Sequence, residues 1–454
     1  MVYVHALRIE THLLLHGSLF RCEQPSVSYA VCPFVNPTPG QCAVGHCLPA
    51  LLAGILLVPV AYATARAFWG RQSALLTAGL IASSSILIDF SVNARGYSML
   101  FTTFLLMLLL ARYLLMHSNL FGWAILAVLS ALGLFTIPTM LYGYGTVMGW
   151  LLLSRRALRS TKSDGNWWRG FLLSAAIAVI ITGMLYLPAF VGSGANPMAG
   201  QPDEIKPGTL IGLLAGLGSM FTAVWNQWNR DLPLALQAVL AVGFIASQVV
   251  AFRQIRNRGL PLVIPAVLWC MPMVFAVWMV PYPRVWLLFL PVYLGLASAG
   301  LLSIARAVVK RPLPHAAMLL GAVVLCGSGW LQAQVVLERA AYCREERWPL
   351  PDAEEVTAYL RDNLREGDRV YGHRATLCIL EYYFGENEMD TSHIYATPQN
   401  ARRVIVLLRT DIETLDSTLS YLSKQQPDLS LQGDGRLLRT FPKAALYEFV
   451  ASDE

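Results

Sequence analysis

Apolar stretches long enough to cross a lipid bilayer recur along most of this chain, and they limit its architecture more than any other feature. A transmembrane helix needs about 20 predominantly apolar residues. Ten runs of roughly that length occur, at 48–66, 73–89, 97–115, 119–136, 138–154, 169–192, 232–252, 260–280, 284–305 and 313–333. Because lipid offers no hydrogen bonds to the backbone, we expect these runs to form helices.

The composition agrees with a membrane protein of many spans. Hydrophobic residues make up 56% of the 454 residues, only 14% are charged, and the mean hydropathy is +0.51. An ordinary globular domain is about one quarter charged. The predicted fold class is an all-α polytopic membrane protein of about ten transmembrane helices, followed by a small soluble α/β domain. A further Gly-rich run at 208–225 is expected to be a re-entrant or interfacial helix.

Arginine placement predicts the orientation in the membrane. Threading the ten spans brings most Lys and Arg clusters to one side, namely Arg66 and Arg71, Arg112, 155–169, 253–258 and 306–311. The positive-inside rule makes that side cytoplasmic. We therefore predict a multi-pass protein of the cell (inner or plasma) membrane, whose net charge of +6 reflects topology rather than nucleic-acid binding.

Three regions differ in composition and are treated as separate. Residues 44–338 hold the spans, and from 339 to 454 charged residues become frequent. In that last region, an amphipathic helix at 351–364 and short β-like runs at 368–372, 404–408 and 445–450 predict a small α/β domain, which the threading puts on the outer face. Residues 1–43 have neither a full span nor helical periodicity. Their cysteines lack the paired spacing of a structural zinc site, so no metal site is predicted.

Three segments carry a resemblance to a known family. They are Leu48–Tyr62 with Phe68–Leu76, then Asp89–Ser98, and then Pro281–Trp286 ahead of a helix bearing Leu and Pro. The second segment holds the sequence Ser-Val-Asn-Ala-Arg-Gly-Tyr between two apolar runs. It resembles the second outer loop of the GT-C integral-membrane glycosyltransferases, a superfamily that includes protein O-mannosyltransferases and aminoarabinose transferases. The resemblance covers about 44–310.

The resemblance implies a sugar transfer at the outer membrane face. The donor would be a sugar linked to a polyprenyl phosphate, and the acceptor a hydroxyl or amine of a lipid, a glycan or a protein. Such a reaction requires a carboxylate to take the acceptor proton and cations to stabilise the departing lipid phosphate. No cofactor is predicted, a divalent cation stays open, and no nucleic acid is expected as a partner.

Candidate residues for these roles lie in the outer turns. Asp89, at the outer end of a span, is the first candidate for the base, with a helix cap or an ion pair with Arg95 as the structural alternative. Arg95 and Arg284 are the candidates for the donor phosphate, since guanidinium groups bind oxyanions in a bidentate way. Tyr97 and Tyr282 could add a hydroxyl there or serve only as interfacial belt residues.

A long outer loop at 193–231 is the candidate for sugar and acceptor contacts. Its polar and aromatic residues are Asp203, Glu204, Lys206, Trp225, Trp228 and Arg230. Aromatic rings suit sugar stacking, although the two tryptophans also fit an interfacial anchor.

The amino-terminal region departs from the family pattern. Family members begin with a span and a long outer loop whose acidic residue is regarded as the base, and this chain shows neither. Residues 1–43 are therefore expected to be a remnant of that first outer loop, with Glu10 as a second candidate base, and the start of the chain is expected to be aberrant or truncated. Two other functions stay open: a catalytically inactive paralogue or accessory subunit, and a transporter of lipid or sugar.

Overall fold

The computed structural model describes 42–92, 96–117, 119–157, 164–193, 209–253, 260–308, 322, 325–334, 350, 352–395, 403–410, 413–425 and 431–451. The chain divides into two compact units, Met1–Val336 and Leu337–Glu454, and each is described by itself.

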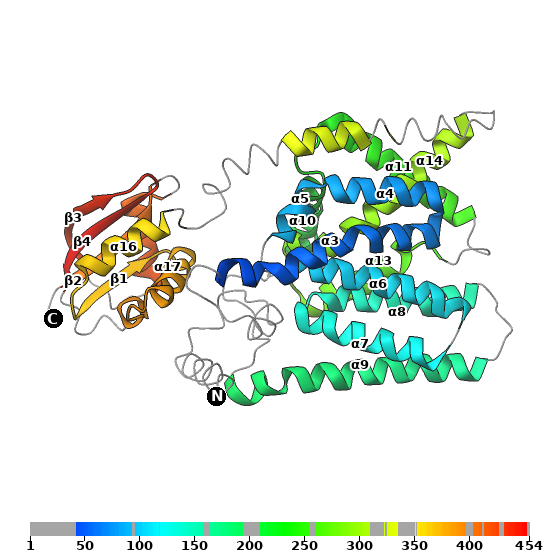
Figure 1. Ribbon diagram of the computed structural model, residues 1–454, viewed down its shortest axis with the longest axis horizontal. Helices are drawn as coiled ribbons and strands as arrows, with labels where there is room; N and C mark the ends of the chain where they lie inside the picture. The colour runs from blue at the N-terminus through cyan, green and yellow to red at the C-terminus, as the bar shows by residue number, and fades with distance from the viewer. Residues whose placement is uncertain are drawn as a thin grey trace. The chain divides into compact units, whose positions relative to one another are not determined.

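The first unit is a bundle of helices that run side by side (Figure 1). Its elements are α3 (Cys42–Trp69), α4 (Arg71–Ser83), α5 (Ser85–Ser91), α6 (Tyr97–Met116), α7 (Leu120–Thr136), α8 (Met140–Ala157), α9 (Asp164–Ser193), α10 (Leu210–Trp228), α11 (Leu234–Arg253), α13 (Val263–Val277), the 3-10 helix η3 (Pro283–Phe289) and α14 (Leu290–Val308). Within the described residues, six helices are long and apolar enough to cross a membrane, or seven if α4 and α5 count as one bent span.

One expectation about the spans differs from the structure. The run at 73–89 is not one straight helix, because α4 and α5 meet at an angle of 64°. Ser84 between them has extended backbone angles (φ −69°, ψ 114°), which interrupt the helical hydrogen bonds. The run at 208–225 is a helix as expected, α10, whose 19 residues are also long and apolar enough for a span. Its re-entrant or interfacial position stays a prediction. The last expected span, 313–333, lies mostly outside the described residues.

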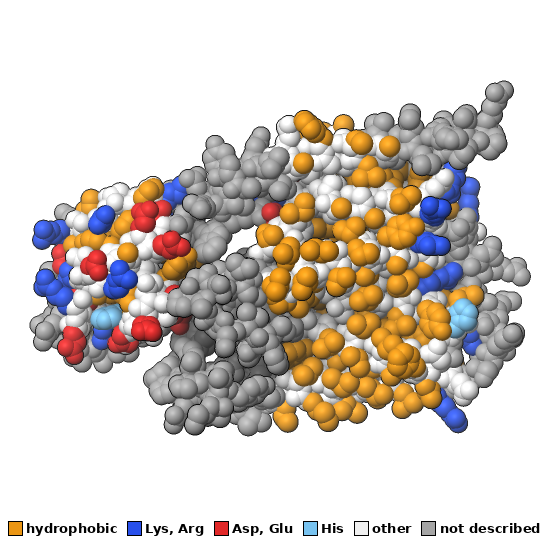
Figure 2. All heavy atoms as spheres, viewed as in Figure 1, with side chains coloured by type: hydrophobic (Ala, Val, Ile, Leu, Met, Phe, Trp, Pro, Cys, Tyr) orange, Lys and Arg blue, Asp and Glu red, His pale blue; other side chains and the backbone are white. Residues whose placement is uncertain are grey.

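The two ends of the bundle differ in charge. Figure 2 shows apolar side chains over the sides of the bundle and Lys and Arg gathered at one end. Contacts between elements place these arginines together at that end: Arg306 Nη2 donates to Gln72 Oε1 at 2.7 Å, and Arg112 Cζ lies 5.9 Å from the Phe68 ring centroid. This separation is the one that the positive-inside rule describes, and we call this end the arginine-rich end.

Close packing of α11 against α14 holds the bundle together on one side. A Cβ atom on Gly300 would lie 1.7 Å from the Gly243 carbonyl oxygen, so the two backbones touch. Small residues let transmembrane helices approach this closely, and van der Waals contact then drives their association. The packing extends to a large apolar core in which Trp123, Trp150 and Phe101 are fully buried.

The second unit is a four-stranded sheet with helices, in the strand order β1-β2-β4-β3. Its strands are β1 (Asp368–Gly372), β2 (Arg403–Arg409), β3 (Leu431–Thr440) and β4 (Ala444–Ala451), and its helices are α16 (Ala353–Asn363), α17 (Arg374–Glu386), α18 (Ser392–Tyr395) and α19 (Leu415–Gln425). β1 pairs with β2 in parallel, and the other pairs are antiparallel. The helix predicted at 351–364 is α16, and β3 is the strand that the sequence did not indicate.

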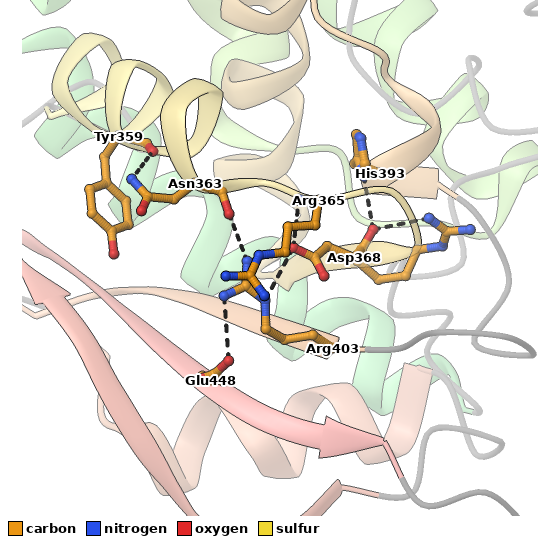
Figure 3. A network of polar contacts seen from close by, with 8 residues as sticks. Tyr359, Asn363, Arg365, Asp368, His393, Arg403 and Glu448 are labelled. Atoms are coloured by element: carbon orange, nitrogen blue, oxygen red, sulfur yellow. Dashed lines mark hydrogen bonds and ion pairs between the residues drawn. The ribbon is translucent and has the colours of Figure 1, made fainter.

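A buried polar network ties the sheet of the second unit to the turn before β1 (Figure 3). The Asp368 side chain is only 3% exposed and accepts hydrogen bonds from Arg403 Nε at 3.1 Å and from the Arg365 amide at 2.8 Å. Arg403 Nη2 also donates to the Asn363 carbonyl at 2.8 Å. The hydrogen bond with Asp368 raises the pKa of Arg403, so its guanidinium stays charged.

Candidate functional site

A cluster of polar side chains lies at the end of the bundle opposite the arginine-rich end. Asp89 Oδ2 is 3.9 Å from Arg230 Nη1, and Arg230 Nε is 3.8 Å from Asp231 Oδ2. Ser85 Oγ donates to Asp231 Oδ2 at 2.7 Å. Asp89 and Ser85 belong to α5, whereas Arg230 and Asp231 belong to the turn between α10 and α11. We call these four residues the α5–turn cluster.

Burial distinguishes the carboxylates of this cluster from its cation. The side chains of Asp89 and Asp231 are 15% and 12% exposed, whereas that of Arg230 is 40% exposed. Placing two carboxylates in such a sheltered position is costly without a nearby positive charge. Arg230, which lies between them, supplies that charge and keeps part of its guanidinium in contact with solvent.

The turn that carries Arg230 and Asp231 is held from inside the bundle. Asn229 is 1% exposed, donates through Nδ2 to the Trp225 carbonyl at 3.0 Å, and accepts from the Tyr293 hydroxyl at 3.2 Å. Asp231 has φ 65°, a left-handed conformation that is uncommon for residues other than glycine. This backbone conformation directs the chain from α10 into α11 while both charged side chains stay beside α5.

A third segment closes the cluster from the other side. The Ser85 amide, left without a helical partner by the break at Ser84, donates to the Gln332 side-chain oxygen. Gln332 lies in the helix at 325–334 and is buried. The bend between α4 and α5 thus exposes a backbone donor that a residue far along the chain satisfies, which fixes the orientation of α5 and of Asp89.

Arg284 and Tyr282 lie where the chain enters η3. The Arg284 Cζ atom is 5.0 Å from the centroid of the Tyr282 ring, a cation–π distance. Tyr282 is 42% exposed and Arg284 is half-buried. Since η3 leads directly into α14, this guanidinium is carried on a short element anchored by the buried residues Trp286, Leu287 and Leu288.

The remaining aromatic candidates pack inside the bundle. Tyr97 is 8% exposed, with its ring 4.7 Å from that of Phe90, so the ring is part of the core. The Trp225 and Trp228 rings lie 6.3 Å and 5.3 Å from the Tyr293 ring, and both side chains are half-buried. These rings support the turn at Asn229, and their contact with a sugar remains a prediction.

The structure describes some of the predicted site residues and not others. Glu10, Arg95, Asp203, Glu204 and Lys206 lie outside the described residues. Asp89 and Arg230, which the sequence assigned to different parts of the site, lie together. Sequence reasoning missed Ser85 and Tyr293, since a serine or tyrosine in an apolar run gives no distinguishing signal. Asp231 had one signal, its position directly after Arg230 in a predicted outer loop.

Within the described residues, no group of three or more His, Cys, Asp and Glu side chains comes together as metal ligands. The carboxylates of the α5–turn cluster are only two, and an arginine stands between them.

The bundle and its cluster define the class as a polytopic membrane protein with a polar site at one end of apolar helices. Over 88% of its length the chain is similar to 83% of ArnT from Cupriavidus metallidurans in the apo state, with a TM-score of 0.52 and 12% identity. That likeness shows a shared fold.

Two further solved structures show weaker likeness. ArnT from Cupriavidus metallidurans bound to undecaprenyl phosphate matches with a TM-score of 0.47 and 13% identity, covering 89% of this chain and 84% of that one. The Archaeoglobus fulgidus oligosaccharyltransferase complex with Zn and sulfate matches with a TM-score of 0.36 and 15% identity, covering 71% and 44%. No family model and no curated protein matches the chain.

Proposed function

We propose that this protein is a membrane glycosyltransferase that moves a sugar from a polyprenyl-phosphate-linked donor to an acceptor at the outer face of the membrane. The observation that carries this proposal is the fold shared with ArnT over 88% of the chain, with a TM-score of 0.52. The α5–turn cluster supports it, because its carboxylates and cation stand where apolar helices end and a lipid-linked substrate would present its phosphate.

The proposed reaction needs one proton transfer and one departing phosphate. The acceptor oxygen or nitrogen forms a bond to the anomeric carbon of the sugar while the bond from that carbon to the lipid phosphate oxygen breaks. The bonding electrons leave with the phosphate, and the acceptor proton goes to a carboxylate. Asp89 is our candidate for that carboxylate, since it is sheltered but not enclosed, with 15% of its side chain exposed.

Cations stabilise the charge that grows on the phosphate. Arg284 is our candidate for this contact, because its guanidinium lies at the start of η3 beside an exposed tyrosine ring. The planar edge of a guanidinium donates two parallel hydrogen bonds to a phosphate. Arg230 then has a different role in the proposal: it holds the Asp89 and Asp231 carboxylates in position rather than binding the donor.

The charge separation of the bundle supports an outer location for the reaction. The positive-inside rule predicts that the arginine-rich end is cytoplasmic, and the α5–turn cluster and Arg284 would then lie on the outer side. Nucleotide sugars are cytoplasmic, whereas a polyprenyl-linked sugar is available at the outer face. The second unit, Leu337–Glu454, is proposed to lie on that face too.

The test is sugar transfer in membranes that contain the full chain, with a panel of polyprenyl-phosphate sugars and a mixed acceptor pool. We expect transfer from at least one donor, and loss of transfer in Asp89→Asn. Asp416→Asn, a substitution of an exposed carboxylate in α19, is the matched control and should keep full activity. If the folded chain transfers no sugar from any donor, the accessory-subunit alternative replaces this proposal.

A further inference from the structure

A cavity of about 100 Å³ lies at the arginine-rich end of the bundle, away from the α5–turn cluster. It is formed where the ends of α3, α11 and α14 meet the start of α4 and the segment before α13. The residues that line it are Phe68, Trp69, Ser73, Ser247, Val250, Ala251, Leu260, Pro261, Leu262, Leu296, Ala299, Ser303 and Arg306.

Hydrogen bonds and ring contacts hold the walls of this cavity in place. Trp150 Nε1 donates to the Leu260 carbonyl at 2.8 Å, and the Leu260 amide donates to Ser154 Oγ at 3.1 Å. Both backbone groups of Leu260 are thus satisfied by α8. The Phe68 ring lies 5.3 Å from the Trp150 ring, so α8 fixes a second wall as well. Two walls of the cavity, at Leu260 and at Phe68, are therefore in contact with α8.

The polar groups of the cavity lie on two neighbouring helices. Ser247 Oγ on α11 donates to the Phe244 carbonyl at 2.6 Å, and Ser303 Oγ on α14 donates to the Ala299 carbonyl at 2.8 Å. Ser247 Oγ also accepts from Gln248 Nε2 at 3.0 Å, so one of its lone pairs is taken. The other lone pair of Ser247 and the lone pairs of Ser303 can accept from a ligand that carries its own O–H groups. Such a ligand would combine hydroxyls with a group that the nearby arginine can bind.

Arg306 supplies a positive charge at the margin of the cavity. Its side chain is exposed, and its Nη2 donates to the neutral amide oxygen of Gln72 at 2.7 Å. Among the described residues, no carboxylate forms an ion pair with Arg306. A second guanidinium lies near the cavity, because Arg112 Cζ is 5.9 Å from the centroid of the Phe68 ring, and Phe68 lines the cavity. The electrostatic preference of the cavity is therefore for an anion.

We propose that this cavity binds the headgroup of an anionic phospholipid from the membrane leaflet at the arginine-rich end, with the phosphate on Arg306 and headgroup hydroxyls toward Ser247 and Ser303. Arginines at the ends of transmembrane helices attract anionic lipids, and basic pockets between helices hold their headgroups. A cavity of about 100 Å³ admits a phosphate with a small polyol but no acyl chain, so the chains stay in the bilayer. The lipid would join α3, α4, α11 and α14 and stabilise their packing.

This site lies at the opposite end of the bundle from Asp89 and does not depend on the proposed sugar transfer. Binding can therefore be measured without any glycosyl donor. Failure of the transfer assay and failure of lipid binding are separate results.

The experiment is native mass spectrometry of the detergent-solubilised full chain, with phosphatidylglycerol, phosphatidylcholine and inorganic phosphate as the three probes. We expect retained phosphatidylglycerol adducts, which fall roughly fivefold in Arg306→Gln, the loss of one cation near the headgroup. Arg306→Lys should restore most of the binding. Arg169→Gln, which removes an exposed arginine at the same end but outside the cavity lining, is the control and should bind as the wild type does.

A second variant separates the cavity from its charge. Ser303→Leu keeps Arg306 and fills the space, so it should also lose the adducts. Equal retention of phosphatidylglycerol and phosphatidylcholine, or equal retention by wild type and both cavity variants, would overturn the proposal. Binding of inorganic phosphate alone, with no preference for the lipid, would overturn it as well, because the lipid is then not the ligand.

Discussion

Asp89 Oδ2 and Arg230 Nη1 lie 3.9 Å apart, although one belongs to α5 and the other to the turn after α10. The pair exists because the bend at Ser84 turns α5 away from α4 and toward that turn. Arg230 also contacts Asp231, whose carboxylate accepts from Ser85 on the same helix as Asp89. One arginine thus connects two carboxylates, and their separate roles can be tested by substitution.

Asp89→Asn should lower sugar transfer by about 10²- to 10⁴-fold, the usual contribution of a positioned general base. Arg230→Gln should lower it less, because that residue positions the base and does not take the proton. The measurement is the rate of transfer at saturating donor for both variants, with Asp416→Asn in α19 as the control. Full activity of Asp89→Asn would remove Asp89 from the base role.

Arg284→Ala should reduce transfer by about 10²- to 10³-fold, since it removes one stabilising cation from the departing phosphate. Arg284→Lys should recover part of the rate but not the bidentate contact. Arg253→Ala, an exposed arginine at the arginine-rich end, is the matched control. Equal transfer by Arg284→Ala and the control, with both proteins folded in membranes, would exclude the donor-phosphate assignment.

Single cysteines should report the orientation of the bundle. In a background without the eight native cysteines, Val92→Cys after α5 should react with a membrane-impermeant maleimide added from outside. Asn119→Cys, at the turn between α6 and α7 on the arginine-rich end, should react only after the membrane is opened. Both sites are exposed on the structure, so accessibility from each side decides the result. The reverse labelling pattern would contradict the outer location of the α5–turn cluster.

Gly300→Ala should destabilise the bundle, because the new Cβ would lie 1.7 Å from the Gly243 carbonyl oxygen and push α14 away from α11. Overpacking of this kind costs about 1–3 kcal/mol. Gly183→Ala in α9 is the control, since a Cβ there meets no atom within 4 Å. The midpoint of thermal unfolding of the solubilised chain should be lower for Gly300→Ala than for the wild type. The midpoint of the control should not fall. Equal midpoints for Gly300→Ala and the wild type would mean that α11 and α14 can move apart without loss of stability.

Arg403→Met should destabilise the second unit by about 3–5 kcal/mol, because it leaves the buried Asp368 carboxylate without its ion pair. Hydrogen bonding with Asp368 raises the pKa of Arg403, so the contribution of this arginine is fully present below its unfolded pKa and is lost only as pH rises past the folded one. We therefore expect the same loss at pH 6 and pH 9, measured by hydrogen exchange of β1 and β2. Arg361→Met, an exposed arginine of α16, should show no such loss.

The amino-acid sequence alone determined the class of this protein. Apolar runs, arginine clusters that all fall on one side of the threaded spans and the polar turn at 89–97 are local signals, because hydropathy acts on each segment by itself. The same holds for the strands β1, β2 and β4, which the short β-like runs predicted.

Only the tertiary structure decided which residues meet. Three contacts join segments far apart in the chain: that of Asp89 with Arg230, that of Tyr293 with Asn229, and that between the backbones of Gly243 and Gly300. Such contacts depend on how the helices pack, which no single segment encodes. The role of a serine or glycine in an apolar helix therefore cannot be predicted until the helix that packs against it is known.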